Sequence, residues 1–429
     1  MRPRTSSWIG FAGLCVGTIA VLAPGLAQER PAPEPPAGQE QDVDALIRQL
    51  ASTNATERAT AACWLGRLRS ADVRRARDEL LALLTDGTEV EGRLCRDEHQ
   101  RWNAGRREES SPGREAAIAL EELGTEVLEP LLDVLDGEDA MGRENAAFAL
   151  GLVESPTAIA PLARALERDG TPAVRARAAW ALGMIESRES VAGLSRAVRD
   201  DDDAQTRSEA AWALGMIEDV EGVPALNIAI EDQDPEVRAQ AAWGLGMIEH
   251  RDGVAGLRTA VRDSDARVRA QAAWALGMIE HPAGVMPLSQ AMEDESADVR
   301  SQAAWGLGMI EHASGVPALL EGLRDEDAEV RSQSAWGLGM IESRDGTSGL
   351  IEALRDLDAE VRAQSAWALG MIEDPSAAEA LMDALDDEDP KVREQAMWAL
   401  GMVMRSGGFD RVDRRELAAA LRRALARDP

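Results

Sequence analysis

Two kinds of apolar segment alternate along most of this chain, and both have the spacing of amphipathic helices. The longer kind is illustrated by VRAQAAWGLGMIE, and closely similar strings begin at Val268, Val299 and Val361. At about 100° per residue, one side of this helix collects the apolar residues Val237, Ala241, Ala242, Leu245 and Ile248. The shorter kind, such as GVAGLRTAV, also has apolar residues at helical spacing. The pattern therefore predicts units of two helices each.

Tryptophan positions give the length of the unit. Seven tryptophans follow one another at intervals of 31 residues, and Trp180 lies 32 residues before the first of them. Phe148, Ile118 and Cys63 occupy the corresponding position in weaker upstream copies. Cys63 and Ile118 are 55 residues apart, so we expect an insertion at about residues 86–110. The period predicts an all-α solenoid of about eleven helical-hairpin repeats over residues 42–410.

Each longer helix has a start signal. Thr171, Asp234 and Asp389 place a capping oxygen directly before a proline, which suits the first helical position. The repeats without this proline are expected to be capped by Asp203, Asp265, Asp327, Asp358 and, in one case, Ser296. The chain ends in DRRELAAALRRALARDP, which has no tryptophan. We expect residues 411–429 to form a polar capping helix over the open end of the stack.

The unit DPEVRAQAAWGLGMIEHRDGVAGLRTAVRD resembles the HEAT-like repeat of the phycobilin lyase family. The residues that carry the resemblance are Asp234, Val237, Arg238, Ala241, Ala242, Leu245, Gly246 and Ile248. The resemblance implies a right-handed α-solenoid whose longer helices line the concave side. It also implies that ligands contact the variable positions Ala239, Gln240, Trp243 and Met247. Glu249 departs from the family, which ends this helix with glycine.

The candidate binding surface is the repeated pair of tryptophan and methionine, which lies off the side that the framework buries. We call its members the Trp/Met row: Trp180, Met184, Trp212, Met216, Trp243, Met247, Trp274, Met278, Trp305, Met309, Trp336, Met340, Trp367, Met371, Trp398 and Met402. Two interpretations stay open. The side chains either fill this surface by packing on one another, or a partner binds them, since monomers rarely expose apolar patches beyond about 300–600 Å².

The formal net charge of −31 limits the classes of partner. Nucleic acid is excluded, because its phosphates need clustered Lys and Arg. Docking on anionic lipid is disfavoured for the same reason. The charge favours a protein or peptide partner with basic groups, although a solvated acidic surface is the simpler explanation.

The sequence gives no catalytic or metal constellation, and we expect no cofactor. Histidines His250, His281 and His312 recur one repeat apart, too far to share an ion whose bonds are about 2 Å long, and we expect them to be exposed linker residues. Deoxyhypusine hydroxylase is similar in fold and holds iron through His-Glu pairs, but here Ala239-Gln240 replaces such a pair. We assign a structural role, an Asp–Arg ladder between neighbouring repeats, to Arg207, Arg238, Arg269, Arg300, Arg331, Arg362 and Arg393.

The N-terminus has the pattern of an export signal. Arg2 and Arg4 precede a short apolar run, and Ala27 offers a small residue for cleavage. We expect a signal peptide over residues 1–27, a Pro-rich linker over 28–41, and a periplasmic or secreted protein; an uncleaved membrane anchor is the alternative. In an oxidising compartment Cys63 and Cys95 can form a disulfide, and two separate thiols are the alternative.

These observations predict an exported, non-enzymatic interaction scaffold that binds a partner segment along a concave Trp/Met groove. One alternative is a HEAT-repeat enzyme that binds a cofactor such as a tetrapyrrole, similar to a lyase or an oxidoreductase. A second alternative is a self-assembling structural protein, because the Trp/Met row could equally receive another copy of the chain and form a homo-oligomer.

Overall fold

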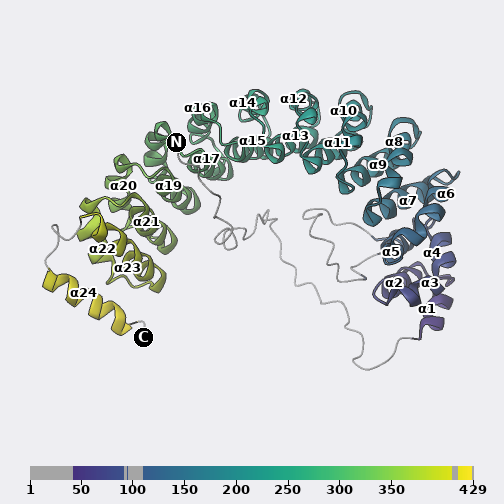
Figure 1. Ribbon diagram of the computed structural model, residues 1–429, viewed down its shortest axis with the longest axis horizontal. Coiled ribbons are helices and arrows are strands. Elements are labelled where there is room, and N and C mark those ends of the chain that lie inside the picture. Colours follow the sequence, from purple (N-terminus) through teal and green to yellow (C-terminus); the bar gives the residue numbers. More distant parts are fainter. Residues whose placement is uncertain (1–41, 91–93, 95–109, 408–413, 428–429) are drawn as a thin grey trace, which may run out of the picture. The chain divides into compact units, whose positions relative to one another are not determined.

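The computed structural model describes residues 42–90, 94, 110–407 and 414–427, which divide into two compact units. The first unit ends at Val153 and the second begins at Glu154. Helices account for the regular structure of the described residues, apart from one antiparallel bridge between Val90 and Ser110. The expected all-α fold is therefore confirmed (Figure 1). The expected signal peptide and Pro-rich linker lie outside these residues.

The first unit begins with the short helix α1 (Val43–Gln49). Three of its helices are of the longer kind: α2 (Ala55–Leu65), α5 (Pro112–Glu121) and α7 (Ala140–Val153). The others are the short helices α3 (Ser70–Arg75), α4 (Arg77–Leu83) and α6 (Leu128–Leu135). Helix α5 packs against α2 and α7, the packing expected of successive repeats. The bridge between Val90 and Ser110 joins the two ends of the expected insertion, of which residues 91–93 and 95–109 lie outside the described part.

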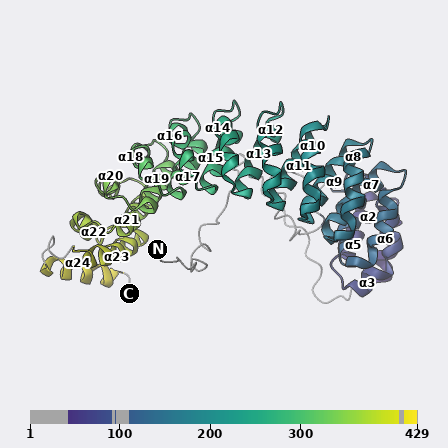
Figure 2. The same ribbon diagram turned by 45° about the horizontal axis from the view of Figure 1, so that its top comes forward.

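The second unit alternates long and short helices. The long helices are α9 (Pro172–Met184), α11 (Ala204–Ile217), α13 (Pro235–Ile248), α15 (Ala266–Met278), α17 (Ala297–Met309), α19 (Ala328–Ile341), α21 (Ala359–Ile372) and α23 (Pro390–Arg405). The short helices are α8 (Ile159–Arg168), α10 (Val191–Asp200), α12 (Val223–Ala229), α14 (Val254–Ala260), α16 (Val285–Ala291), α18 (Val316–Gly322), α20 (Thr347–Ala353) and α22 (Ala378–Ala384), followed by α24 (Arg414–Arg427). Within this unit each long helix packs against the long helices before and after it, so the long helices form one row and the short helices another (Figures 1 and 2).

The core lies between the two rows, on the side of the long helix that the sequence pattern predicts. Val237, Ala241, Ala242 and Leu245 of α13 are all fully buried, and Ile248 is half-buried. The short helix α14 contributes Leu257, which is also fully buried. With eleven long helices among the described residues, the structure confirms a solenoid of about eleven helical hairpins.

Most long helices of the second unit start at the expected capping residue. Asp234 accepts a hydrogen bond from the Glu236 backbone N–H, and Asp203, Asp265, Asp327, Asp358 and Asp389 act in the same way. Thr171 and Ser296 occupy the cap position of α9 and α17, but their side chains make no capping hydrogen bond there. In the described part of the chain, no helix is long and apolar enough to cross a membrane.

Candidate binding surface

Arginine–aspartate pairs connect the linkers at the N-terminal ends of the long helices. Arg238 on α13 donates from Nε and Nη2 to both carboxylate oxygens of Asp263, at 2.6 and 2.8 Å. The same two-bond contact recurs, and we call the seven pairs the Arg–Asp row: Arg175–Asp201, Arg207–Asp232, Arg238–Asp263, Arg269–Asp294, Arg300–Asp325, Arg331–Asp356 and Arg362–Asp387. The expected ladder between repeats is therefore confirmed for six of the seven predicted arginines, and the structure adds Arg175. Its acidic member is not the capping aspartate but the aspartate two residues before it. The seventh predicted arginine, Arg393, donates to the backbone carbonyls of Asp387 and Glu388.

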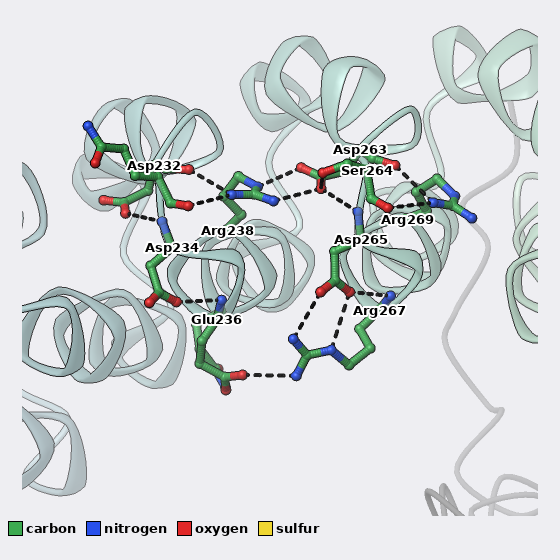
Figure 3. Close-up of polar contacts among 11 residues, drawn as sticks. Asp232, Asp234, Glu236, Arg238, Asp263, Ser264, Asp265, Arg267 and Arg269 are labelled. Atoms are coloured by element: carbon green, nitrogen blue, oxygen red, sulfur yellow. Dashed lines mark hydrogen bonds and ion pairs between the residues drawn. The ribbon is translucent and has the colours of Figure 1, made fainter.

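Each arginine of this row joins the linker before its own long helix to the linker before the next long helix (Figure 3). Arg238 Nη1 donates to the backbone carbonyl of Asp232, whose own carboxylate accepts from Arg207. Asp263 accepts in addition from the backbone N–H of Asp265, the next capping residue. These contacts link successive repeats into one continuous polar network, and its side chains are only about a tenth exposed, for example 13% for Arg238 and 11% for Asp263.

The network sets the protonation of its carboxylates. Burial alone would raise the pKa of Asp263, but the hydrogen bonds from Arg238 and the Asp265 N–H, together with the charge of Arg238, lower it overall. The same balance lowers the pKa of Asp232, Asp294, Asp325, Asp356 and Asp387. These carboxylates therefore stay ionised, and it is the ionised form that pairs with arginine and connects the repeats.

Seven of the eight tryptophan rings in the Trp/Met row, from Trp212 to Trp398, lie over a glycine of the preceding repeat. A Cβ added to Gly246 would come within 2.6 Å of Cζ3 of Trp274, so any side chain there would displace the ring. The same approach, at 2.5–2.8 Å, joins seven pairs: Gly183–Trp212, Gly215–Trp243, Gly246–Trp274, Gly277–Trp305, Gly308–Trp336, Gly339–Trp367 and Gly370–Trp398. In each pair, one edge of the following tryptophan fills the space that a side chain at the glycine would need.

The Trp/Met row is partly buried by its own neighbours. Trp212 stacks on Trp243, and Trp305 stacks on Trp336, with ring centroids 6.5 Å apart in both pairs. Trp180 is 8% exposed and belongs to the core, the next six tryptophans and all eight methionines are half-buried, and Trp398 is 40% exposed. The row therefore both connects repeats and presents apolar atoms to solvent along one side of the long helices.

A row of glutamates follows the methionines at the C-terminal ends of the long helices. Its members, the Glu row, all have left-handed backbone conformation with φ of +50° to +54°: Glu154, Glu186, Glu218, Glu249, Glu280, Glu311, Glu342 and Glu373. Glutamate therefore occupies the conformation for which the family uses glycine, at a cost of about 1–2 kcal/mol per residue. Seven of these side chains are exposed and Glu373 is half-buried.

Members of the Glu row act on one another. Partial burial and the charges of Glu311 and Glu249 raise the pKa of Glu280. Glu280 thus faces the like charges of Glu249 and Glu311, whereas the carboxylates of the Arg–Asp row face arginine. Glu249 was recognised in the sequence as a departure from the family, but nothing in the sequence revealed its backbone conformation.

The histidines next to the Glu row have a structural role. Nδ1 of His250, His281 and His312 accepts a backbone N–H and caps the short 3₁₀ turns Arg251–Gly253, Pro282–Gly284 and Ala313–Gly315. Ser187, Asp219, Ser343 and Asp374 cap the corresponding turns elsewhere. His312 is exposed as expected, whereas His250 and His281 are half-buried.

The remaining candidate chemistry is limited. Among the residues that the structure describes, no three or more His, Cys, Asp and Glu side chains are arranged to hold a metal ion. Cys63 in α2 is buried and disulfide-bonded. Cys95 lies outside the described residues, so its pairing with Cys63 stays a prediction.

Comparison with solved structures shows the fold. Kap95p, in a structure with RanGDP, matches with a TM-score of 0.57 and 15% identity over 89% of this chain and 56% of that one. Importin beta matches with a TM-score of 0.57 and 17% identity over 85% and 56%. The CpcE–CpcF complex of phycocyanin lyase from Nostoc matches with a TM-score of 0.35 and 19% identity over 55% and 94%. No curated protein matches the chain in sequence.

Family models match the repeats directly. The model for HEAT repeats matches residues 128–215, 222–292, 285–356 and 347–429. The model for the PBS lyase HEAT-like repeat matches residues 206–232, which span most of α11, all of α12 and the start of the next linker. Together with the stacked helical hairpins, these matches show that the chain belongs to the HEAT-repeat family.

Proposed function

We propose that this protein is an exported, non-enzymatic scaffold that binds a basic partner segment along the Trp/Met row and the Glu row of its second unit. The observation that carries the proposal is the Glu row. Eight successive long helices end in a glutamate with left-handed backbone conformation, and in seven of them this glutamate stands two residues after the methionine of the Trp/Met row. Strained residues of this kind persist where they serve a function.

Three costs of the Glu row support this interpretation. The left-handed conformation disfavours any side chain, whereas glycine would adopt it freely. An acid at the C-terminal end of a helix opposes the helix dipole. Neighbouring carboxylates repel one another, as the raised pKa of Glu280 indicates. Glycine would remove all three costs, so stability of the stack alone does not account for glutamate.

The partner's chemistry follows from the two adjacent rows. Basic side chains complement the Glu row, and apolar side chains complement the half-buried Trp and Met atoms, of which methionine adapts to varied shapes. Packed helices lie about 8–10 Å apart, and an extended peptide advances about 3.3 Å per residue. A segment with an apolar residue at every third position and Lys or Arg between would therefore match the rows. The structures of Kap95p with RanGDP and with Nup1 support a protein as the class of partner for a solenoid of this fold.

Export remains part of the proposal and has its own test. Expression of the full chain with its N-terminus intact should give a mature protein that begins near Gln28 and is found outside the cytoplasm. Mass determination of the purified protein checks the cleavage, and an intact N-terminus found in the membrane fraction would replace secretion by anchoring.

The binding test uses charge reversal in the Glu row. The probe is a fluorescent peptide of about fifteen residues with Leu at every third position and Lys or Ser between, a spacing set by the helix rows. The triple variant Glu249→Lys/Glu280→Lys/Glu311→Lys should lose at least tenfold in affinity by anisotropy. The matched control Glu231→Lys/Glu293→Lys/Glu321→Lys, which changes the net charge equally at exposed acids beyond the Glu row, should bind as the unmodified protein does.

Two further arms separate the apolar contribution from charge. A peptide with Ser in place of Leu should bind more weakly and should leave the Trp emission unchanged, because it no longer reaches the indoles. Equal loss in both triple variants would mean that the peptide follows net charge alone. That result, or no binding by the unmodified protein, would contradict the proposal.

A further inference from the structure

In the second unit a tryptophan–glycine contact joins each repeat to the one after it, and this series of contacts ends at α23. Seven glycines from Gly183 to Gly370 each receive the tryptophan of the following repeat. Gly401 on α23 stands at the same position of the last repeat, and a Cβ added there would meet nothing within 4 Å. Among the described residues, then, the contact that holds each repeat to the next is left open at α23.

The open position belongs to an exposed stripe on one face of α23. Glu394, Trp398, Gly401 and Arg405 are spaced by four, three and four residues, so they lie on one side of the helix, and all four are exposed. One repeat earlier, Ala363 and Gly370 stand at the positions of Glu394 and Gly401, and both are buried. The stripe is therefore the face on which another repeat would pack.

Helix α24 does not cover this stripe. It packs against α22, where Arg423 donates to the Asp386 carboxylate at 2.7 Å, and thus continues the row of short helices. Trp398 remains 40% exposed, which is the largest exposed fraction among the tryptophans of the Trp/Met row. Among the described residues, α23 therefore presents a large exposed aromatic ring beside an open glycine.

The order of residues in the stripe is self-complementary. Glu394 and Arg405 are placed symmetrically about the peptide bond between Ala399 and Leu400, and so are Trp398 and Gly401. Two α23 helices laid antiparallel would therefore place each Glu394 opposite an Arg405 and each Trp398 opposite a Gly401. Such reciprocity is the requirement for a two-fold interface, in which the same patch is used by both copies.

We propose that the exposed stripe of α23 is a docking surface for a second copy of this chain, related by a two-fold axis that passes between the two α23 helices at the level of the Ala399–Leu400 peptide bond. The Trp398 ring of each copy lies over Gly401 of the other, in the way that the rings of the preceding repeats lie over their glycines. Glu394 and Arg405 form an ion pair at each edge, for which Arg405 leaves its contact with Met402 of its own helix. One helix face per copy is a small interface, so the dimer is reversible, with micromolar affinity.

The test measures mass against concentration by sedimentation velocity or light scattering. The full chain should change from monomer to dimer as its concentration rises through the micromolar range. Gly401→Ala should weaken the dimer at least tenfold, because the added Cβ occupies the place of the indole edge. This substitution raises helix propensity, so misfolding does not explain the loss. The matched control is Gly193→Ala, at another helical glycine with nothing within 4 Å, and it should dimerise as the unmodified chain does.

Charge exchange provides the decisive arm. Glu394→Arg and Arg405→Glu should each weaken the dimer by placing like charges opposite one another, and the double variant Glu394→Arg/Arg405→Glu should restore it. A chain that stays monomeric, a Gly401→Ala variant that dimerises normally, or a double variant as weak as the single ones would overturn the proposal. Peptide binding along the Glu row is unaffected in all these variants, so this inference stands or fails separately from the proposed function.

Discussion

At the N-terminal ends of the long helices, carboxylates of the second unit face arginine; at the C-terminal ends of the same helices, they face one another. Asp263 accepts two hydrogen bonds from Arg238, and its pKa is lowered despite its burial. Glu280 lies between Glu249 and Glu311, and its pKa is raised. Both rows repeat with the period of the solenoid, so the difference between them is systematic.

The comparison separates residues that the stack needs from residues that it only tolerates. The Arg–Asp row connects linkers, contains buried charge and is satisfied within the chain. In the Glu row every member has the left-handed conformation, seven of the eight are exposed, and Glu280 faces like charges, so glycine would serve such a helix end better. The first row therefore explains the fold, and the second needs an explanation outside it. Four predictions test this distinction.

The largest effect is expected from acid, which acts on every pair of the Arg–Asp row at once. The folded-state pKa of these aspartates lies below the ordinary value of about 3.9, so they stabilise the fold above that value and lose this contribution as pH falls through the lowered pKa. Denaturant midpoints measured from pH 7 to pH 2 should fall steeply below about pH 4. The raised pKa of Glu280 has the opposite sign, so its protonation as the pH falls should slightly stabilise the protein before the aspartates are protonated. A midpoint that is flat below pH 4 would contradict the role of the Arg–Asp row.

Removing one arginine of the Arg–Asp row should also lower the free energy of unfolding strongly, through the single aspartate that loses its partner. Arg269→Met leaves Asp294, which is 11% exposed, without its partner, and we expect a loss of about 3 kcal/mol in the free energy of unfolding. The control is Arg267→Met, two residues away, whose side chain is 64% exposed and whose ion pairs should contribute less than about 1 kcal/mol. Equal losses from the two variants would mean that burial of the Arg–Asp row has no special weight.

Substitution in the Glu row should act in the opposite direction. Glu280→Gly removes the left-handed strain and the repelled charge together, and we expect a gain of about 1 kcal/mol in the free energy of unfolding. The control is Glu321→Gly, within α18, where glycine should destabilise by about 1 kcal/mol. Thermal melting of the two variants compares them directly, and a loss at Glu280 would show that the fold itself requires this glutamate.

The smallest effect isolates charge from strain. Glu280→Gln keeps the left-handed side chain and removes only the repulsion, so we expect a gain of a few tenths of a kcal/mol at low salt. The gain should disappear at about 1 M salt, where the Debye length is only about 3 Å and exposed charges are screened from one another. A gain that is independent of salt would show that the repulsion inferred for Glu280 is not electrostatic.

Much of the fold follows from the period alone. The side of the helix that carries Val237, Ala241 and Leu245 is buried as predicted, because an amphipathic helix packs its apolar side against the core. The capping residues were also identifiable, since Asp before the first turn satisfies free N–H groups locally. Local pattern and local hydrogen bonds were sufficient for these features.

The candidate surface was predicted less completely. The Trp/Met row was found from its position off the framework side, but its burial depends on the neighbouring repeat. Trp180 is buried and Trp398 is exposed, although both stand in nearly the same local sequence. No string of thirteen residues contains that difference, because it arises from what packs on each ring.

The sequence by itself therefore determined the repeat, the helical hairpin and the side of each helix that forms the core, because all three depend on residues within one unit. Tertiary structure decided which aspartate meets which arginine, which glycine receives which indole, and where that series stops at Gly401. It also showed that Glu249 and its equivalents adopt the backbone of glycine. These properties belong to contacts between repeats and to backbone geometry, and neither is encoded in the spacing of apolar residues.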